Sequence, residues 1–289
     1  MRTPRASYEF LLEVYRKFNE HNGFLLSAGV AFFAFFSLFP LLIFMGIALG
    51  FVLEDEATRD QILDFVFRNF PVGASLVEGT IRALIANRSS AGFIALIALL
   101  WSGTNLFGSL ALGLNDVYEV KETRNLAKLK LVSVGVYFII IALFLISFAA
   151  VSVASVFRDE VLSLVFPHTV VVFAWTIISV ALAFVSTLLL FLIVYWLVPN
   201  VKLSFRDVWV GALVAGLTWQ VTNYLFALYL NAFARTGYGL VYGSLATIVL
   251  LLFWMYISAV LLLIGAEVNV LYKRRIVGGV KVFEPRKVG

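Results

Sequence analysis

Six long apolar runs constrain this chain more than any other feature. They cover approximately residues 24–53, 91–114, 129–157, 168–198, 207–232 and 241–272. Each run exceeds the roughly 20 residues that an α-helix needs to cross the ~30 Å hydrocarbon core of a bilayer. A backbone inside lipid must find its hydrogen-bond partners internally, and a helix does so within one segment. We therefore expect an all-α, polytopic membrane protein with six transmembrane helices.

The composition excludes a water-soluble protein. Hydrophobic residues make up 62% of the 289 residues, charged residues make up 13%, and the mean hydropathy is +0.99. A soluble domain of this length has too little interior to bury so much apolar surface. The chain has no cysteine and only two histidines, so it offers neither a thiolate nor a histidine-rich metal site. We expect no metal and no cofactor.

Most basic residues lie on one set of connections between the runs. The N-terminus, the second and fourth loops and the C-terminal tail hold 16 of the 22: Arg2, Arg5, Arg16, Lys17, Lys121, Arg124, Lys128, Lys130, Lys202, Arg206, Lys273, Arg274, Arg275, Lys281, Arg286 and Lys287. Cytoplasmic loops of membrane proteins are enriched in lysine and arginine. We therefore expect both termini in the cytoplasm.

The segments outside the runs predict three further features. Residues 1–22 predict a cytoplasmic amphipathic helix, because apolar residues share one side: Phe10, Leu11, Val14, Tyr15 and Phe18. A frayed tail is the alternative. Residues 23–275 form the transmembrane domain, in which residues 54–90 predict an outer hairpin of two short amphipathic helices. Residues 276–289 are a basic cytoplasmic tail.

Polar side chains recur on single faces of three runs, at about 100° per residue along a helix. The candidates for a lipid or substrate pathway are Ser102, Asn105, Ser109, Gln220, Asn223, Ser244, Thr247, Ser258, Glu267 and Asn269. Such residues line hydrated cavities, but they also hold membrane helices together, and both interpretations stay open. A stripe of small residues predicts a helix-packing face and consists of Gly211, Ala215, Thr218 and Thr222.

Two residues inside the runs are unusual for their position. Glu267 is a carboxylate well inside an apolar run, one to two turns before Lys273-Arg274-Arg275. It is either a proton- or headgroup-sensing acid or an interfacial carboxylate paired with a basic residue. Pro40 removes a backbone donor within the first run and predicts a kink or break. The kink is either a hinge that moves or a fixed bend in the helix.

Several segments of the runs are distinctive. They are AGVAFFAFFSLFPLL at residues 28–42, YWLVPN at residues 195–200, Gly211-Ala212, and YGSLATIVLLLFWMYISAVLLLIGAEVN at residues 242–269, together with the stretch from Trp101 to Asn115. In these segments the chain resembles the YihY/BrkB family of bacterial inner-membrane proteins. The resemblance touches five of the six runs. It implies a multi-pass protein of the bacterial inner (cytoplasmic) membrane, and it suggests a role in lipid movement, since some members are linked to export of lipid A precursors.

Members of this family have also been labelled ribonuclease BN. The enzyme of that name resembles a metallo-β-lactamase and needs a histidine-rich metal motif, which two histidines cannot build. We therefore expect no nuclease activity and no enzyme.

The sequence thus favours a protein that moves or hands over lipid, either phospholipid or a lipid A precursor, with membrane lipids and envelope lipid-transport proteins as partners and no nucleic acid. Candidates for contact with the headgroup phosphate are Arg124, Lys128, Lys202 and Arg206. The same charges are also ordinary topology signals. A non-transporting envelope scaffold and a small-solute or ion transporter coupled through Glu267 are the alternatives. The oligomeric state is not encoded in any motif that we recognise.

Overall fold

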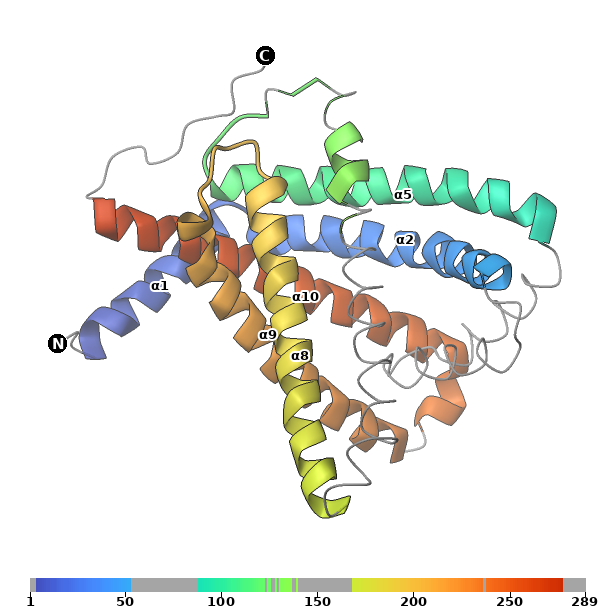
Figure 1. Ribbon diagram of the computed structural model, residues 1–289. Coiled ribbons are helices and arrows are strands. Elements are labelled where there is room, and N and C mark those ends of the chain that lie inside the picture. The colour runs from blue at the N-terminus through green and yellow to red at the C-terminus, as the bar shows by residue number, and fades with distance from the viewer. Residues whose placement is uncertain are drawn as a thin grey trace. The chain divides into compact units, whose positions relative to one another are not determined.

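The computed structural model describes residues 4–52, 88–122, 124–125, 128, 130–136, 139, 168–235 and 238–277. The described residues form helices and no β-strand, which confirms the all-α class (Figure 1). The helices with assigned bounds are α1 (Pro4–Glu20), α2 (Gly23–Val52), α5 (Arg88–Val117), α8 (His168–Leu197), α9 (Phe205–Arg235) and α10 (Tyr238–Val277).

Five of these helices coincide with apolar runs of the sequence. Their ends lie within five residues of the expected ends in every case. Most of the run at 129–157, the outer hairpin up to residue 87 and the tail from residue 278 lie outside the described residues. Two described segments are long and apolar enough to cross a membrane, Val180–Leu197 and Ile248–Arg275. A third is added if Tyr8–Glu20 and Gly23–Leu38 count as one broken span.

Local signals explain where the helices begin and end. The backbone N–H of Ser204 donates to the Oδ2 atom of Asp207 at 2.8 Å, the carboxylate half of a capping box. The helix α9 therefore begins at Phe205, two residues before the apolar run at 207–232. The helix α2 continues through Pro40, so the chain is not broken there, and the hinge stays a prediction.

The chain divides into two compact units. The first contains Met1–His21, Leu114–Gln220 and Leu262–Gly289, and the second contains Asn22–Gly113 and Val221–Leu261. The second unit includes α2 and most of α5. In it, the ring of Phe226 on α9 stacks on Trp254 on α10, with centroids 4.7 Å apart. The first unit holds α1, α8, the first half of α9 and the last part of α10, and it contains the candidate site.

The helix α1 is apolar on two sides, whereas the sequence predicted one. Val14, at 5% exposed, and Phe18 are buried, and Val14 packs with Val268 and Leu271 of α10. Leu11, at 64%, and Tyr15 are exposed on the outside. The five apolar residues expected on one side are therefore split between an inner face against protein and an outer face. The helix is formed, so the alternative of a frayed tail is wrong for residues 4–20.

A close crossing joins α9 to α10 in the first unit. The backbone N–H of Gly211 donates to the Oδ1 atom of Asn269 at 2.6 Å. A Cβ atom on Gly211 would collide with the backbone oxygen of Gly265 and with Asn269, and one on Gly265 would collide with Ala215 and Tyr195. The small residues let the two backbones touch, which confirms the packing face for Gly211 and Ala215. Thr218 is exposed and bonds within its own helix.

Candidate functional site

The candidate site is built around Glu267, a carboxylate in the apolar helix α10. Its side chain is only 1% exposed. Taking an ionised carboxylate out of water costs several kcal/mol unless a partner compensates for it. The partner is His21, whose Nδ1 atom lies 2.6 Å from the Oε1 atom of Glu267. A histidine and a carboxylate at this distance share a proton.

His21 is placed by the end of α1. Its backbone N–H donates to the carbonyl of Lys17 at 3.0 Å, so it lies in the last turn. The next residue, Asn22, has a φ of +51°, in the left-handed region that asparagine tolerates better than most residues. The chain then enters α2 at Gly23. The break between the two helices thus fixes the imidazole against α10.

Glu119 completes the site from the end of α5. The N–H of Val120 bonds the carbonyl of Asn115 and the N–H of Glu119 bonds that of Asp116, the pattern of a Schellman cap. Glu119 occupies the left-handed position of this cap, with a φ of +55°, where glycine is usual. A non-glycine residue there stores some strain. Its side chain bonds Arg274 at 2.7 Å.

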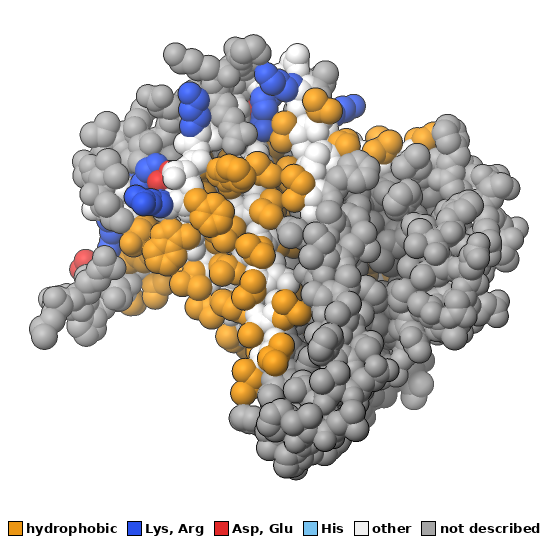
Figure 2. Space-filling view, in the orientation of Figure 1, with side chains coloured by type: hydrophobic (Ala, Val, Ile, Leu, Met, Phe, Trp, Pro, Cys, Tyr) orange, Lys and Arg blue, Asp and Glu red, His pale blue; other side chains and the backbone are white. Residues whose placement is uncertain are grey.

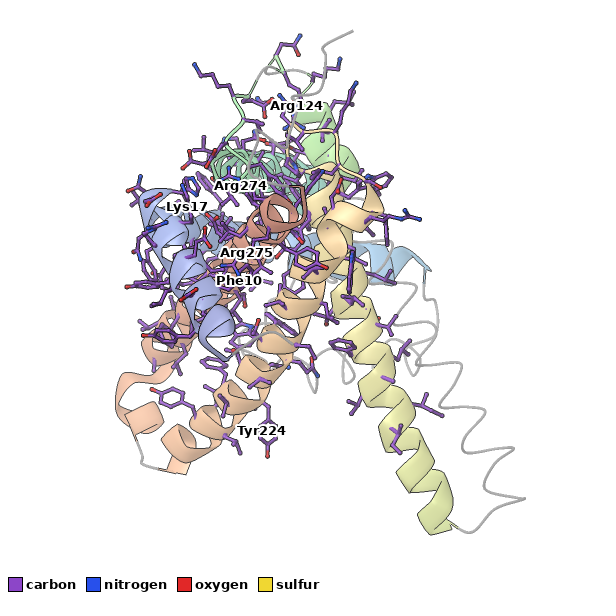
Figure 3. The ribbon with its side chains drawn as sticks, turned by 90° about the vertical axis from the view of Figure 1, so that its left-hand side faces the viewer. Phe10, Lys17, Arg124, Tyr224, Arg274 and Arg275 are labelled. Carbon is purple, nitrogen blue, oxygen red and sulfur yellow. The ribbon has the colours of Figure 1, made fainter. Side chains whose placement is uncertain are left out.

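We call the resulting set the α1–α10 cluster; it consists of Lys17, His21, Glu119, Glu267 and Arg274. Besides Arg274, Glu119 approaches Lys17 at 3.7 Å and the Nε2 atom of His21 at 3.8 Å. Figure 3 shows Lys17 and Arg274 close together where α1 meets the end of α10. The cluster links a buried carboxylate to the aqueous surface through one imidazole.

The surroundings shift the pKa values of His21 and Glu119 in the α1–α10 cluster. The hydrogen bond to Glu267 raises the pKa of His21, although partial burial opposes the shift. Burial alone would raise the pKa of Glu119, but the hydrogen bond and charge of Arg274 outweigh it, and the pKa is lowered. The pair therefore favours a charged imidazolium beside a charged surface carboxylate.

The three basic residues at the end of α10 form ion pairs with α1, with α9 and with the turn after α5. Arg274 pairs with Glu119, Lys273 with Asp207 of α9 at 3.0 Å, and Arg275 with Glu13 of α1 at 2.9 Å. The guanidinium of Arg275 also lies over the ring of Phe10 (Figure 3). The three cations are therefore engaged with partners other than Glu267. Glu267 is thus a buried carboxylate with a histidine partner, and both interpretations of its role stay open.

A second polar group ties the turn after α5 to the turn between α8 and α9. The side chain of Asn115 accepts the backbone N–H of Asn200 at 2.7 Å and donates to Glu122 at 2.8 Å. Arg124 bonds both oxygens of Glu122 and the carbonyl of Val198. Arg124 is consequently built into the fold, with its side chain almost fully buried.

We predict that Asn115→Ala destabilises the protein by about 1–3 kcal/mol, because it leaves the buried N–H of Asn200 without its partner. Thermal unfolding in detergent measures the effect. The control is Asn105→Ala, since Asn105 bonds only the carbonyl of Trp101 in its own helix among its described contacts. Equal unfolding midpoints for the two variants would contradict the structural role of Asn115.

The pathway candidates are distributed over the two units. Asn269 bonds Gly211 and Glu267 bonds His21, both in the first unit, where Gln220 also lies. The second unit holds Ser102, Asn105, Ser109, Asn223, Ser244, Thr247 and Ser258. Ser102 is buried, whereas Asn105, Ser109, Gln220, Asn223 and Ser258 are partly exposed, and the side chains of Ser244 and Thr247 lie outside the described part. Asn269 thus acts as helix-packing glue, and a shared pathway stays a prediction.

The headgroup candidates differ in exposure. Lys128, Lys202 and Arg206 are exposed, in contrast to Arg124. Figure 2 shows Lys and Arg side chains at the upper end of this side of the molecule, above a surface of apolar side chains. We use the name basic–aromatic face for the exposed residues around the α8–α9 turn, which are Trp196, Lys202, Phe205, Arg206 and Trp209. The Nε1 atom of Trp196 donates to the carbonyl of Leu203 and holds the indole on the turn.

Sequence reasoning missed His21 and Glu119 as members of the site. In the sequence, the two histidines are informative only in excluding a histidine-rich metal site. The signal that identifies His21 is the need of Glu267 for a proton donor, in a chain with just two histidines. No sequence signal identifies Glu119, because its position depends on the cap of α5. In the described part of the chain, no cluster of three or more ligating side chains is arranged to hold a metal.

Comparison with known proteins gives a consistent result. The family model described as virulence factor BrkB matches residues 14–287. The ribonuclease-like protein YfkH of Bacillus subtilis (strain 168) is 32% identical over 273 residues, which are 92% of this chain and 96% of that protein. UPF0761 membrane proteins of Aliivibrio salmonicida (strain LFI1238) and Pseudoalteromonas translucida (strain TAC 125) are 29% and 31% identical over 86% and 83% of this chain and 78% of each relative. No solved structure matches.

Proposed function

Because the chain belongs to the BrkB virulence-factor family of membrane proteins, we propose that it moves or hands over lipid at the bacterial inner membrane without hydrolysing it. The substrate class is a phospholipid or a lipid A precursor, whose headgroup carries phosphate. Both termini lie in the cytoplasm in this proposal, because the basic connections are then cytoplasmic. Exposed apolar side chains offer surface to the acyl chains, among them Ile177 of α8, Leu217 of α9 and Phe253 of α10.

The basic–aromatic face supports this proposal. Lys202 and Arg206 are exposed beside Phe205 and Trp209, which are also exposed. Tryptophan is enriched at the level of the headgroups, where its ring is half in apolar surroundings. Basic side chains at that level attract anionic lipid, each by about 1 kcal/mol. In this face, the aromatic rings can contact the lipid where the headgroup meets the acyl chains, and the basic side chains can contact the phosphate.

We predict that the double variant Lys202→Ala/Arg206→Ala weakens headgroup binding by about 30-fold, since two contacts of about 1 kcal/mol are lost. The measurement is the rate at which purified protein in liposomes moves a fluorescent phospholipid between leaflets or to acceptor vesicles. The control Lys202→Arg/Arg206→Lys keeps both charges and should keep most of the rate. Its retention would show that charge, and not the shape of the turn, matters.

Two outcomes decide against the proposal. Wild-type protein that moves no labelled phospholipid or lipid A precursor above empty vesicles, alone and with envelope partners, contradicts lipid movement. A wild-type rate that is unchanged in the Lys202→Ala/Arg206→Ala variant contradicts the role of the basic–aromatic face. The same vesicles under a pH gradient report ion or small-solute transport, if that is the activity instead.

A further inference from the structure

The imidazole of His21 lies between two carboxylates, of which one is buried and the other is exposed. Its Nδ1 atom lies 2.6 Å from Oε1 of Glu267, and its Nε2 atom lies 3.8 Å from Oε1 of Glu119. The side chain of Glu267 is 1% exposed and that of Glu119 is 43% exposed. One nitrogen therefore faces the protein interior and the other faces a group in contact with water.

Glu267 depends on His21 for its compensation. Its second oxygen, Oε2, is buried and has no hydrogen-bond partner among the described residues. The described contact that satisfies the carboxylate is the one to His21. When the imidazole is protonated, the buried charge has a counter-charge at hydrogen-bond distance. When the imidazole is neutral, Nδ1–H still donates, but the counter-charge is gone.

Other charged groups around the imidazole favour its protonated form. The cations of this neighbourhood are Arg16 and Lys17 of α1 and Arg274 of α10, and the carboxylates are Glu20 of α1, Asp116 and Glu119 at the end of α5, and Glu267 of α10. Asp207 and Lys273 neutralise each other nearby at 3.0 Å. Glu20 pairs with Arg16 and Lys17, and Glu119 pairs with Arg274, so the carboxylate that a proton on the imidazole compensates most directly is Glu267.

Apolar side chains next to this pair hold the inner face of α1 on α10. Val14 packs with Val268 and Leu271, and Phe10 and Ile264 pack against this group. His21 lies at the end of α1 and Glu267 is adjacent to Val268 in α10. Loss of the ion pair therefore acts on the junction of these two helices. Earlier along α1, Glu13 and Phe10 contact Arg275 of α10 and form a second attachment between the two helices.

We propose that His21 and Glu267 form a proton-binding site that latches α1 onto α10. With the proton bound, the imidazolium pairs with Glu267 and α1 is docked. The proton leaves from Nε2 to Glu119 or to water, the imidazole becomes neutral, and the docking of α1 weakens. The His21–Glu267 pair thus exchanges one proton with the water at this end of the protein. This inference goes beyond lipid movement and holds whether or not lipid is moved.

The sign of the pH effect follows from the geometry and from the raised pKa of His21. A group whose pKa is higher in the docked state contributes stability that is fully present below its undocked pKa. This contribution is lost as the pH rises through the docked value. Docking of α1 is therefore strongest at low pH and weakens on the alkaline side of histidine titration.

Proton binding is measured directly by nuclear magnetic resonance on protein labelled at histidine. Only His21 and His168 give signals, and His168→Gln assigns them. We expect the titration midpoint of His21 to fall in Glu267→Gln, which removes the charge but keeps the shape. It should stay unchanged in Glu13→Gln, which removes a pair on the same helix that involves Arg275. An equal midpoint in wild type and Glu267→Gln would overturn the proposal.

Docking is measured by thiol labelling, because the chain has no cysteine of its own. Val14→Cys reports the inner face of α1, and Leu11→Cys, on the exposed face, corrects for the pH dependence of the thiol reaction. Between about pH 6 and about pH 9, which spans histidine titration, the corrected labelling of Val14→Cys should rise several-fold. In a His21→Gln background it should be high at every pH. Corrected labelling that does not change with pH in wild-type His21 would sink the latch, even where Glu267→Gln fails to fold.

Discussion

Gly211→Ala is expected to lower the free energy of unfolding by about 3 kcal/mol or more, although it adds a single methyl group. The Cβ atom would collide with the backbone oxygen of Gly265 and with the side chain of Asn269. Neither the α10 backbone nor a buried asparagine can move aside without separating the helices. The hydrogen bond from Gly211 to Asn269 would be lost in the same step.

Gly216→Ala is the matched control for this variant. Gly216 lies in the same helix, but a Cβ atom there would meet the ring of Phe184 at 3.7 Å, an ordinary contact. Alanine has the higher helix propensity, by about 1 kcal/mol, so this variant should be neutral or stabilised. Thermal unfolding in detergent, followed by circular dichroism, compares the two. A loss of similar size in both variants would refute the close crossing of α9 and α10.

His21→Ala is expected to destabilise the protein by about 3–5 kcal/mol near neutral pH, because it removes the imidazolium that compensates the buried charge of Glu267. At low pH Glu267 can take up a proton instead, and at alkaline pH the wild-type imidazole is itself neutral, so the loss should be smaller on both sides. The measurement is the unfolding midpoint of His21→Ala against wild type over a range of pH. The control Glu13→Gln removes an exposed pair on the same helix and should cost about 0–1 kcal/mol.

The double variant His21→Ala/Glu267→Gln distinguishes a charge effect from lost packing. It has no buried charge to leave unpaired, so it should recover part of the stability lost in His21→Ala. The recovery should be largest near neutral pH. If the double variant is less stable than His21→Ala by the full cost of a further core substitution, the two residues are not coupled, and the assignment of the pair is wrong.

The helices themselves could be predicted from the sequence, because lipid leaves the backbone no alternative. The runs at 24–53 and 168–198 correspond to α2 and α8, whose ends differ from those of the runs by at most one residue. Helical periodicity also identified the stripe of Gly211 and Ala215, since small residues at this spacing have a single structural use. What periodicity cannot supply is the identity of the opposite helix. That Gly211 meets Gly265 and Asn269 of α10 follows only from the structure.

The candidate site could be predicted only in part for the same reason. Glu267 was recognisable because a carboxylate in an apolar run needs a partner. Three cations lay close to it in the sequence, whereas the actual partner is 246 residues away. Lys273, Arg274 and Arg275 point to acids on three other elements instead. Which of several nearby charges forms a pair is decided by tertiary packing, which one helix does not encode.

The outer face of α1 illustrates a different limit. A single apolar stripe was expected from the spacing of Phe10, Leu11, Val14, Tyr15 and Phe18. A stripe this wide covers more than one contact surface, so the structure divides it, with Val14 against α10 and Leu11 exposed. The hydrophobic pattern gives the width of an apolar stripe, and the neighbouring elements decide what covers each part.

The separation of His21 from Glu267 also sets an order of events during synthesis. The two residues are 246 positions apart, and ribosomes add about 5–20 residues per second. Glu267 is therefore synthesised roughly 12–50 s after His21. Throughout that interval Val14 and Phe18 lack the α10 surface that covers Val14 in the finished protein. Docking of the first helix is thus a late step of biogenesis, and a chain that stops before Glu267 leaves this helix exposed to other partners in the cell.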